Sequence, residues 1–297
     1  MRCVGNRHCT MFNFDKFYTD CNNRFNDWKS DPVNYAKNNV YIQASGNEKS
    51  FFYEDKQHEY MPEFFLGDPD SCSAVILNLN PGTADQGFHY KDSRINNYDY
   101  SKKAKGFPLG ASGCKWWFGA NGTGGRNAWI NNLIGNNDWN LKPFALEICP
   151  LHSKSWGGLD YTNTNLRKEI DNYVFDPAFK AVSNSKADFA IAIGKDFVKI
   201  LSDPFFGFKE RLVWDRYNHP QYITWPKNKK GNPTDRTFVL LEKENNRVFC
   251  TYAPGSNRPP GKNFREIEHL FVEEIKNGVK RKIALFFRLE SLNFSPT

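Results

Sequence analysis

Short, continuous apolar runs indicate that the chain folds as an α/β protein. Residues 74–80 (AVILNLN), 143–149 (PFALEIC) and 189–193 (FAIAI) are almost wholly apolar, and Pro81, Pro150 and Gly194 follow them directly. Apolar runs of this length that stop at proline or glycine are typical of strands buried inside a sheet. Residues 237–241 and 247–252 predict two later strands.

Segments with helical periodicity lie between these runs. Residues 127–134, 166–182, 194–201 and 263–276 predict helices, and a further helix is expected to end near Asn39. Strands that alternate with helices predict a three-layer α/β/α sandwich with a central, mostly parallel sheet. In such sheets a ligand binds beyond the carboxyl ends of the strands, so the active cleft is expected there.

The chain length predicts one core with additions. At 297 residues the chain is long for one domain and short for two. We expect an N-terminal extension (1–65) packed on the core, an α/β domain (66–277) and a C-terminal tail (278–297). Residues 83–125 are basic, aromatic and rich in glycine, which is typical of functional loops.

Composition narrows the class of protein. No apolar run approaches the ~20 residues of a membrane span, so no membrane partner is expected. The N-terminus has no apolar signal core, so a cytoplasmic protein is expected. The seven cysteines are scattered, which favours reduced thiols. Cys3, His8, Cys9 and Cys21 match no zinc or iron–sulfur spacing, so neither a metal nor a cofactor is predicted.

The charge balance favours an anionic partner. The formal net charge is +7, and 16% of the residues are aromatic and could stack on bases. Many proteins of this charge bind no nucleic acid, so the composition by itself leaves the partner open.

Two turns of similar sequence follow predicted buried strands. Asn80-Pro81-Gly82 follows the first strand, and residues 253–258 (APGSNR) follow the last. Proline fixes a turn, and glycine lets the backbone approach a ligand closely. Asn-Pro-Gly is also an ordinary turn sequence, but two such turns in one chain favour a binding site.

These residues resemble the uracil-DNA glycosylase superfamily, specifically its mismatch-specific uracil/thymine branch. Residues 77–82 (LNLNPG) are similar to the first motif of that branch, a strand ending in GINPG, and residues 252–258 (YAPGSNR) are similar to the second, a loop that enters the minor groove. Residues 106–109 (GFPL) before Trp116-Trp117 resemble its GFPF stretch, and residues 193–199 (IGKDFVK) its late strand-to-helix turn. The resemblance covers about residues 70–275.

The resemblance implies hydrolysis of the N-glycosidic bond of a base flipped out of double-stranded DNA. It assigns the Asn80 amide oxygen to orientation of the attacking water. An amide takes up no proton at neutral pH, so Asn80 positions water without acting as a general base. In the alternative interpretation, Asn80 only bonds the backbone of its own turn. Asp85, Asp92, Glu147 and His152 are candidates for proton transfer, and we select Glu147 and His152 because they flank the end of the second strand.

Most of the remaining site residues follow from the resemblance, whereas Phe88 and Tyr90 are aromatic residues of the long segment 83–105, which departs from it. The expected base pocket consists of Pro81, Gly82, Phe88, Tyr90, Phe107 and Leu109. The expected DNA contacts are Pro254, Gly255, Ser256, Asn257, Arg258 and Lys262. Leu109 stands where the branch has a stacking phenylalanine, and Phe107 could belong to the core instead.

Ala253 departs from the fast uracil enzymes, which have a histidine at that place. Backbone N–H groups of residues 255–257 would then stabilise the departing base, or contact a phosphate. The sequence has no evident Schiff-base lysine, so base excision without strand cleavage is expected. The long segment 83–105 could admit a bulky modified base, such as one in foreign DNA, which would give an antiviral role.

Three hypotheses remain open at this point. The first is a monomeric, monofunctional DNA glycosylase that needs no obligate protein partner. The second is a non-catalytic nucleic-acid-binding protein that retains the fold, which Ala253 and the net charge favour. The third is a hydrolase or transferase of a small nucleotide or nucleoside, for which binding to long DNA would not depend strongly on salt.

Overall fold

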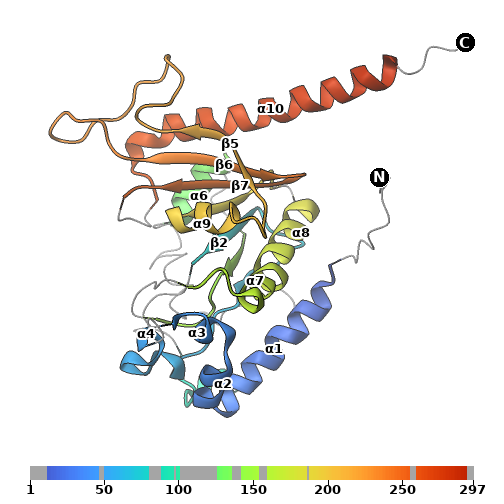
Figure 1. The fold of residues 1–297 in the computed structure, drawn as a ribbon, viewed down its shortest axis with the longest axis vertical. Coiled ribbons are helices and arrows are strands. Elements are labelled where there is room, and N and C mark those ends of the chain that lie inside the picture. The colour runs from blue at the N-terminus through green and yellow to red at the C-terminus, as the bar shows by residue number, and fades with distance from the viewer. Residues whose placement is uncertain are drawn as a thin grey trace, which may run out of the picture.

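A seven-stranded sheet forms the centre of the molecule (Figure 1). The structure is a computed structural model that describes residues 12–46, 50–79, 88–96, 98–100, 126–135, 142–153, 159–185, 187–254 and 259–292. The strand order is β1-β3-β2-β4-β7-β6-β5. The strands are β1 Phe65–Leu66, β2 Ala74–Asn78, β3 Pro143–Glu147, β4 Ala190–Ile193, β5 Lys209–Trp214, β6 Thr237–Lys243 and β7 Asn246–Tyr252.

The four central strands β3, β2, β4 and β7 are parallel, and the α/β prediction is confirmed at this level. The sheet as a whole is mixed, however, because β1, β6 and β5 pair antiparallel with their neighbours. The expectation of a mostly parallel sheet is therefore wrong outside the centre. A two-residue turn at Glu244-Asn245 returns the chain directly from β6 to β7, and so short a connection permits only antiparallel pairing.

Helices cover both faces of the sheet (Figure 1). The α-helices are α1 Phe14–Ser30, α2 Pro32–Asn38, α3 Val40–Gln43, α4 Ser50–Tyr53, α6 Arg126–Ile134, α7 Thr164–Ile170, α8 Asp176–Asn184, α9 Lys195–Leu201 and α10 Arg265–Leu292. There are also 3-10 turns, η2 Glu54–Glu59, η3 Ser93–Ile95 and η5 Lys262–Phe264, and a π-helical turn, η4 Asp171–Phe175. On one face, Trp214, Phe238 and Phe249 pack on Phe271 of α10. On the other, α8 lies across β2, β3 and β4. Although α10 is 28 residues long, no helix in the described part of the chain is long and apolar enough to cross a membrane.

The order of the parallel strands creates a switch point. The chain passes from β2 through α6 to β3 on one side, then returns across β2 through α7 and α8 to β4. From β4 it continues away from β3 towards β7, opposite to the direction of the connection from β2 to β3. The connections after β2 and β4 therefore diverge, and a crevice is expected beyond the carboxyl ends of these two strands.

The N-terminal segment shares the core of the sheet. Phe17 and Tyr18 of α1 pack on Phe65, and Phe14 contacts Phe144 edge to face. β1 then adds to β3, with Phe65 opposite Leu146. This pairing places residues 59–66 beside the carboxyl end of β3. These residues lie outside the part of the chain that the resemblance covers.

Candidate active site

The four parallel strands end together at one edge of the sheet, which we call the carboxyl edge. Asn78 pairs with Glu147 at the ends of β2 and β3, and Ile193 pairs with Thr251 near the ends of β4 and β7. Beyond the strands, the N–H of Cys149 donates to the Leu79 carbonyl over 2.9 Å. The residue before Asn80 is therefore fixed to the segment that leaves β3.

The strands that precede the two turns are close neighbours. Only β4 separates β2 from β7, and adjacent strands are about 4.8 Å apart, so the strand ends at Asn78 and Tyr252 are separated by roughly 10 Å. Both chains leave the sheet at the same edge, because β2, β4 and β7 are parallel. Asn80, Pro81 and Gly82, and residues 255–258 of the second turn, lie outside the described residues.

Glu147 lies buried at the end of β3. The Asn78 side-chain Nδ2 donates to its Oε1 over 3.0 Å, and both side chains are buried. A carboxylate removed from water is costly unless it is hydrogen-bonded, so Asn78 offsets part of this cost. The structure thus places Glu147, a predicted proton-transfer residue, at the carboxyl edge. It lies two residues before Cys149, whose N–H donates to the Leu79 carbonyl.

His152 lies on the segment that follows β3 and faces a second carboxylate. Its Nε2 is 3.4 Å from Oε1 of Glu63, and the side chains are 0% and 1% exposed. The Glu63 backbone N–H donates to the Pro150 carbonyl over 2.8 Å, which holds the two segments together. An imidazole beside a carboxylate can take part in proton transfer, so His152 stays a candidate for that role.

A second imidazole–carboxylate pair joins the N-terminal segment to the segment after β2. Nε2 of His89 is 2.8 Å from Oε2 of Glu59, and this hydrogen bond lowers the pKa of Glu59. The Tyr60 ring packs edge to face on His89 at 5.5 Å and on His152 at 6.4 Å. Tyr60 therefore connects the two pairs through ring contacts.

The two described residues of the predicted base pocket differ in environment. Phe88 is buried in the core and the Arg94 guanidinium lies 4.3 Å from its ring centre. Tyr90 is only partly buried, and its ring lies 4.6 Å from that of His89. The Lys91 ammonium also lies over the Tyr90 ring, 5.2 Å from its centre. Phe107 and Leu109 lie outside the described residues, and the base pocket stays a prediction.

The described residues of the predicted DNA surface are Pro254 and Lys262. Both are exposed, and Lys262 opens η5, which leads directly into α10. Phe264 at the end of η5 packs on Trp225 and Phe238, so Lys262 is anchored beside the start of β6. Among the described residues no group of three or more His, Cys, Asp or Glu side chains is arranged to hold a metal ion. Cys21 is a buried free thiol, and Cys3, His8 and Cys9 lie outside the described residues.

Comparison with known proteins gives no relative. No protein-family model, curated protein or solved structure matches the chain.

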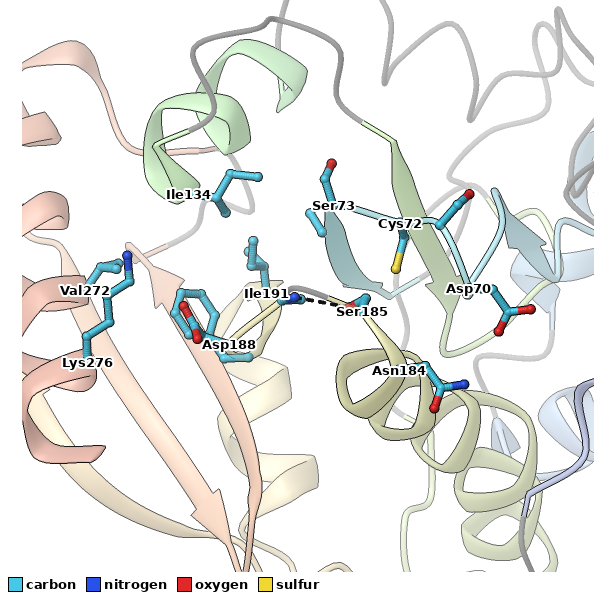
Figure 2. Close-up of a pocket in the computed structure, with 14 residues that line it drawn as sticks. Asp70, Cys72, Ser73, Ile134, Asn184, Ser185, Asp188, Ile191, Val272 and Lys276 are labelled. Carbon is cyan, nitrogen blue, oxygen red and sulfur yellow. Dashed lines mark hydrogen bonds between the residues drawn. The ribbon is translucent and has the colours of Figure 1, made fainter. Parts of the chain in front are cut away.

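A cavity of about 530 Å³ opens at the opposite edge of the sheet (Figure 2). It lies between the first residues of β2 and β4, where Ser73 and Asp188 line it, and α10 contributes Lys276. Cys72 and Asp70 border its other side (Figure 2). Because ligands of doubly wound sheets bind at the carboxyl ends of the strands, this cavity does not belong to the candidate site.

Sequence reasoning missed Glu59, Glu63 and Asn78. Glu63 is a lone carboxylate between Pro62 and an apolar run, Phe64-Phe65-Leu66, and that isolation could have indicated a buried acid. Asn78 interrupts the apolar run of β2, which is also unusual for a buried strand. Only the pairing of β1 with β3 brings the Glu63 segment to the carboxyl edge.

Proposed function

We propose that the chain is a monofunctional DNA glycosylase that hydrolyses the N-glycosidic bond of a flipped damaged, mismatched or modified base in double-stranded DNA. The observation that carries this proposal is the parallel arrangement of β2 and β7 with one strand between them. The strands that precede the Asn80-Pro81-Gly82 and Ala253-Pro254-Gly255-Ser256 sequences therefore end at the same edge of the sheet. We further expect a cytoplasmic monomer.

The reaction breaks the bond between sugar C1′ and the base nitrogen and forms a bond from C1′ to a water oxygen. The bonding electrons leave with the base, and the water loses a proton, so the products are an abasic sugar and a base that regains a proton. In this proposal Asn80 orients the water through its amide oxygen. The backbone N–H groups of residues 255–257 stabilise the charge on the departing base.

Glu147 and His152 are the proposed proton-transfer groups. Both lie on the segment that continues β3 to the carboxyl edge, where hydrogen bonds from Ile148 and Cys149 fix it to Asn78 and Leu79. One of the two accepts the proton from the attacking water, which Asn80 cannot do. Glu63 lies beside the His152 ring, with 3.4 Å between Oε1 and Nε2.

One observation favours the alternative, a nucleic-acid-binding protein without catalysis. Ala253 supplies no imidazole at the start of the second turn, so leaving-group stabilisation depends on backbone groups alone. A modified base whose substituents withdraw electrons stabilises its own negative charge as it leaves, so its departure depends less on the enzyme. Substrates that carry such bases therefore distinguish a specialised glycosylase from a binder.

The test is excision from a panel of duplex oligonucleotides. The duplexes carry uracil, thymine opposite guanine, or a bulky modified cytosine, and alkali then cleaves any abasic site. We expect a cleavage product from at least one modified duplex and none from the unmodified duplex, with no cleavage before alkali. Binding without excision on every duplex would reject the glycosylase and support the binder.

A further inference from the structure

The connection between β5 and β6 forms a long arm, residues 215–236, at the carboxyl edge. β5 ends at Trp214 opposite Phe238, and β6 begins at Thr237 opposite Tyr252, the last residue of β7. The arm therefore leaves the same edge as the two turns of the candidate site. In Figure 1 its loops reach well beyond the sheet from the ends of β5 and β6.

The base of the arm is anchored in the core. Trp225 is buried, packs edge to face on Phe238 and Phe264, and donates its Nε1–H to the Thr234 carbonyl over 2.8 Å. The His219 ring stacks on Trp225 at 5.1 Å. A preformed arm loses little conformational entropy when it binds a partner.

Two tyrosines of the arm face solvent. Tyr217 is 81% exposed and Tyr222 74%, the highest values among the large hydrophobic side chains of the described residues. The Arg216 guanidinium lies 4.5 Å from the Tyr217 ring centre and also pairs with Asp235 over 2.9 Å. Exposed aromatic rings beside cations are typical of surfaces that bind nucleic acids.

The arm is strongly basic. It holds five lysines and arginines against two aspartates, a net charge of +3 out of +7 for the whole chain. Lys227, Lys229 and Lys230 are exposed, and within the described residues none of them forms an ion pair. The Lys227–Pro233 bridge fixes the loop that carries them, so three free cations lie on one tip.

We infer that the 215–236 arm binds the phosphate backbone of duplex DNA beside the candidate site, with lysines 227, 229 and 230 on phosphates and Tyr217 and Tyr222 packed on sugars and bases. This inference rests on the proposed function, which makes DNA the substrate. Lys262 at the foot of the arm extends the same basic surface. In this arrangement the arm binds the DNA backbone away from the flipped nucleotide, and contacts to phosphates do not depend on the base sequence.

The salt dependence of binding tests the three lysines. Each phosphate contact on B-DNA adds about 0.9 to the slope of log affinity against log salt, so three contacts add roughly 2.7. The triple variant Lys227→Ala/Lys229→Ala/Lys230→Ala is compared with Lys142→Ala/Lys209→Ala/Lys243→Ala, whose exposed lysines lie at the start of β3, the start of β5 and the end of β6, towards the opposite edge. With a labelled, unmodified duplex we expect the arm triple to lower the slope by about 2 or more and the affinity at least tenfold at 0.1 M salt. Equal changes in both triples would overturn the inference.

The tyrosines distinguish DNA from other polyanions. Heparin carries sulfates but no bases, so Tyr217→Ala/Tyr222→Ala should weaken duplex binding several-fold, leave heparin binding unchanged and leave the salt slope intact. Tyr217→Phe/Tyr222→Phe should restore duplex binding. Equal losses for duplex and heparin, or no loss for duplex, would contradict the tyrosine contacts.

Excision separates this inference from the proposed function. If wild type excises a base and the arm triple binds and excises as wild type does, the arm inference fails and the glycosylase stands. If no duplex is excised but binding depends on the arm, the glycosylase fails and the arm inference stands. If both hold, the arm triple should raise KM with little change in kcat, because the arm does not touch the reacting atoms.

Discussion

Oε1 of Glu63 and Nε2 of His152 lie 3.4 Å apart, and both side chains are almost completely buried. The carboxylate comes from the segment before β1, and the imidazole comes from the segment after β3. The strands β1 and β3 pair over only two residues. The contact between Glu63 and His152 adds a link between the two segments beyond the paired strands. The pair therefore connects the N-terminal segment to the carboxyl edge and has consequences for both stability and activity.

Glu63→Ala removes the carboxylate and leaves the buried imidazole without this neighbour. We expect the free energy of unfolding to fall by about 2 kcal/mol, because the truncation removes a buried side chain together with its polar contacts. Urea denaturation measures the change. Glu266→Ala is the matched control, since Glu266 is exposed in the first turn of α10 and should change stability by less than ~1 kcal/mol. Equal effects of the two substitutions would show that the Glu63 contact contributes little.

Glu268 makes stability depend on pH. Burial on α10 raises the pKa of its carboxyl to about 7, although the Trp129 Nε1–H donates to Oε1 over 2.6 Å. An unfolded glutamate titrates near pH 4.3. Between about pH 4.3 and 7 the folded state keeps a proton that the unfolded state releases, so stability falls as pH rises through this window. The full loss is on the order of 4 kcal/mol.

Glu268→Gln keeps an oxygen for Trp129 and removes the ionisation. We expect the variant to gain stability relative to wild type as pH rises from about 4 to 7, and the difference to level off above pH 7. Thermal or urea unfolding at a series of pH values measures it, with Glu266→Gln on the same helix as control. A difference that stays constant from pH 4 to 8 would contradict the raised pKa.

Gly67 sets the distance between the end of β1 and the start of β3. Its φ is +91°, and a Cβ atom there would lie 1.8 Å from the Pro143 carbonyl oxygen. Gly135 also has a positive φ, +69°, but a Cβ there would meet nothing within 4 Å. We expect Gly67→Ala to cost more than ~3 kcal/mol of unfolding free energy, or to abolish folding, and Gly135→Ala to cost only about 1 kcal/mol. Similar costs at the two positions would refute the steric argument.

The central strands could be predicted because each is a continuous apolar run that ends at a turn residue. β2, β3 and β4 begin within one residue of the predicted starts. β5 was missed because its sequence, KERLVW, belongs to an edge strand whose first three residues are exposed. The predicted helix 166–182 is interrupted by the π turn η4, which accommodates Pro177 two residues after it. Neither feature has a clear apolar periodicity.

The candidate site was predicted only in part. Glu147 and His152 flank the end of a strand, and that position follows from the apolar pattern. Glu59 and Glu63 come from the expected extension 1–65, and their position depends on the antiparallel addition of β1, a two-residue strand that no periodicity reveals. Long-range pairings of this kind are decided by tertiary packing.

The most direct test of the account is the single-turnover excision rate of Asn80→Ala. The substrate is the duplex that wild type excises best, with enzyme in excess, and Asn184→Ala on the exposed end of α8 is the matched control. We predict that Asn80→Ala still binds the duplex but excises about 100-fold more slowly or worse, because the water loses its orientation, and that Asn184→Ala matches wild type. An Asn80→Ala variant that excises at the wild-type rate would contradict the assignment of the carboxyl edge as the active site.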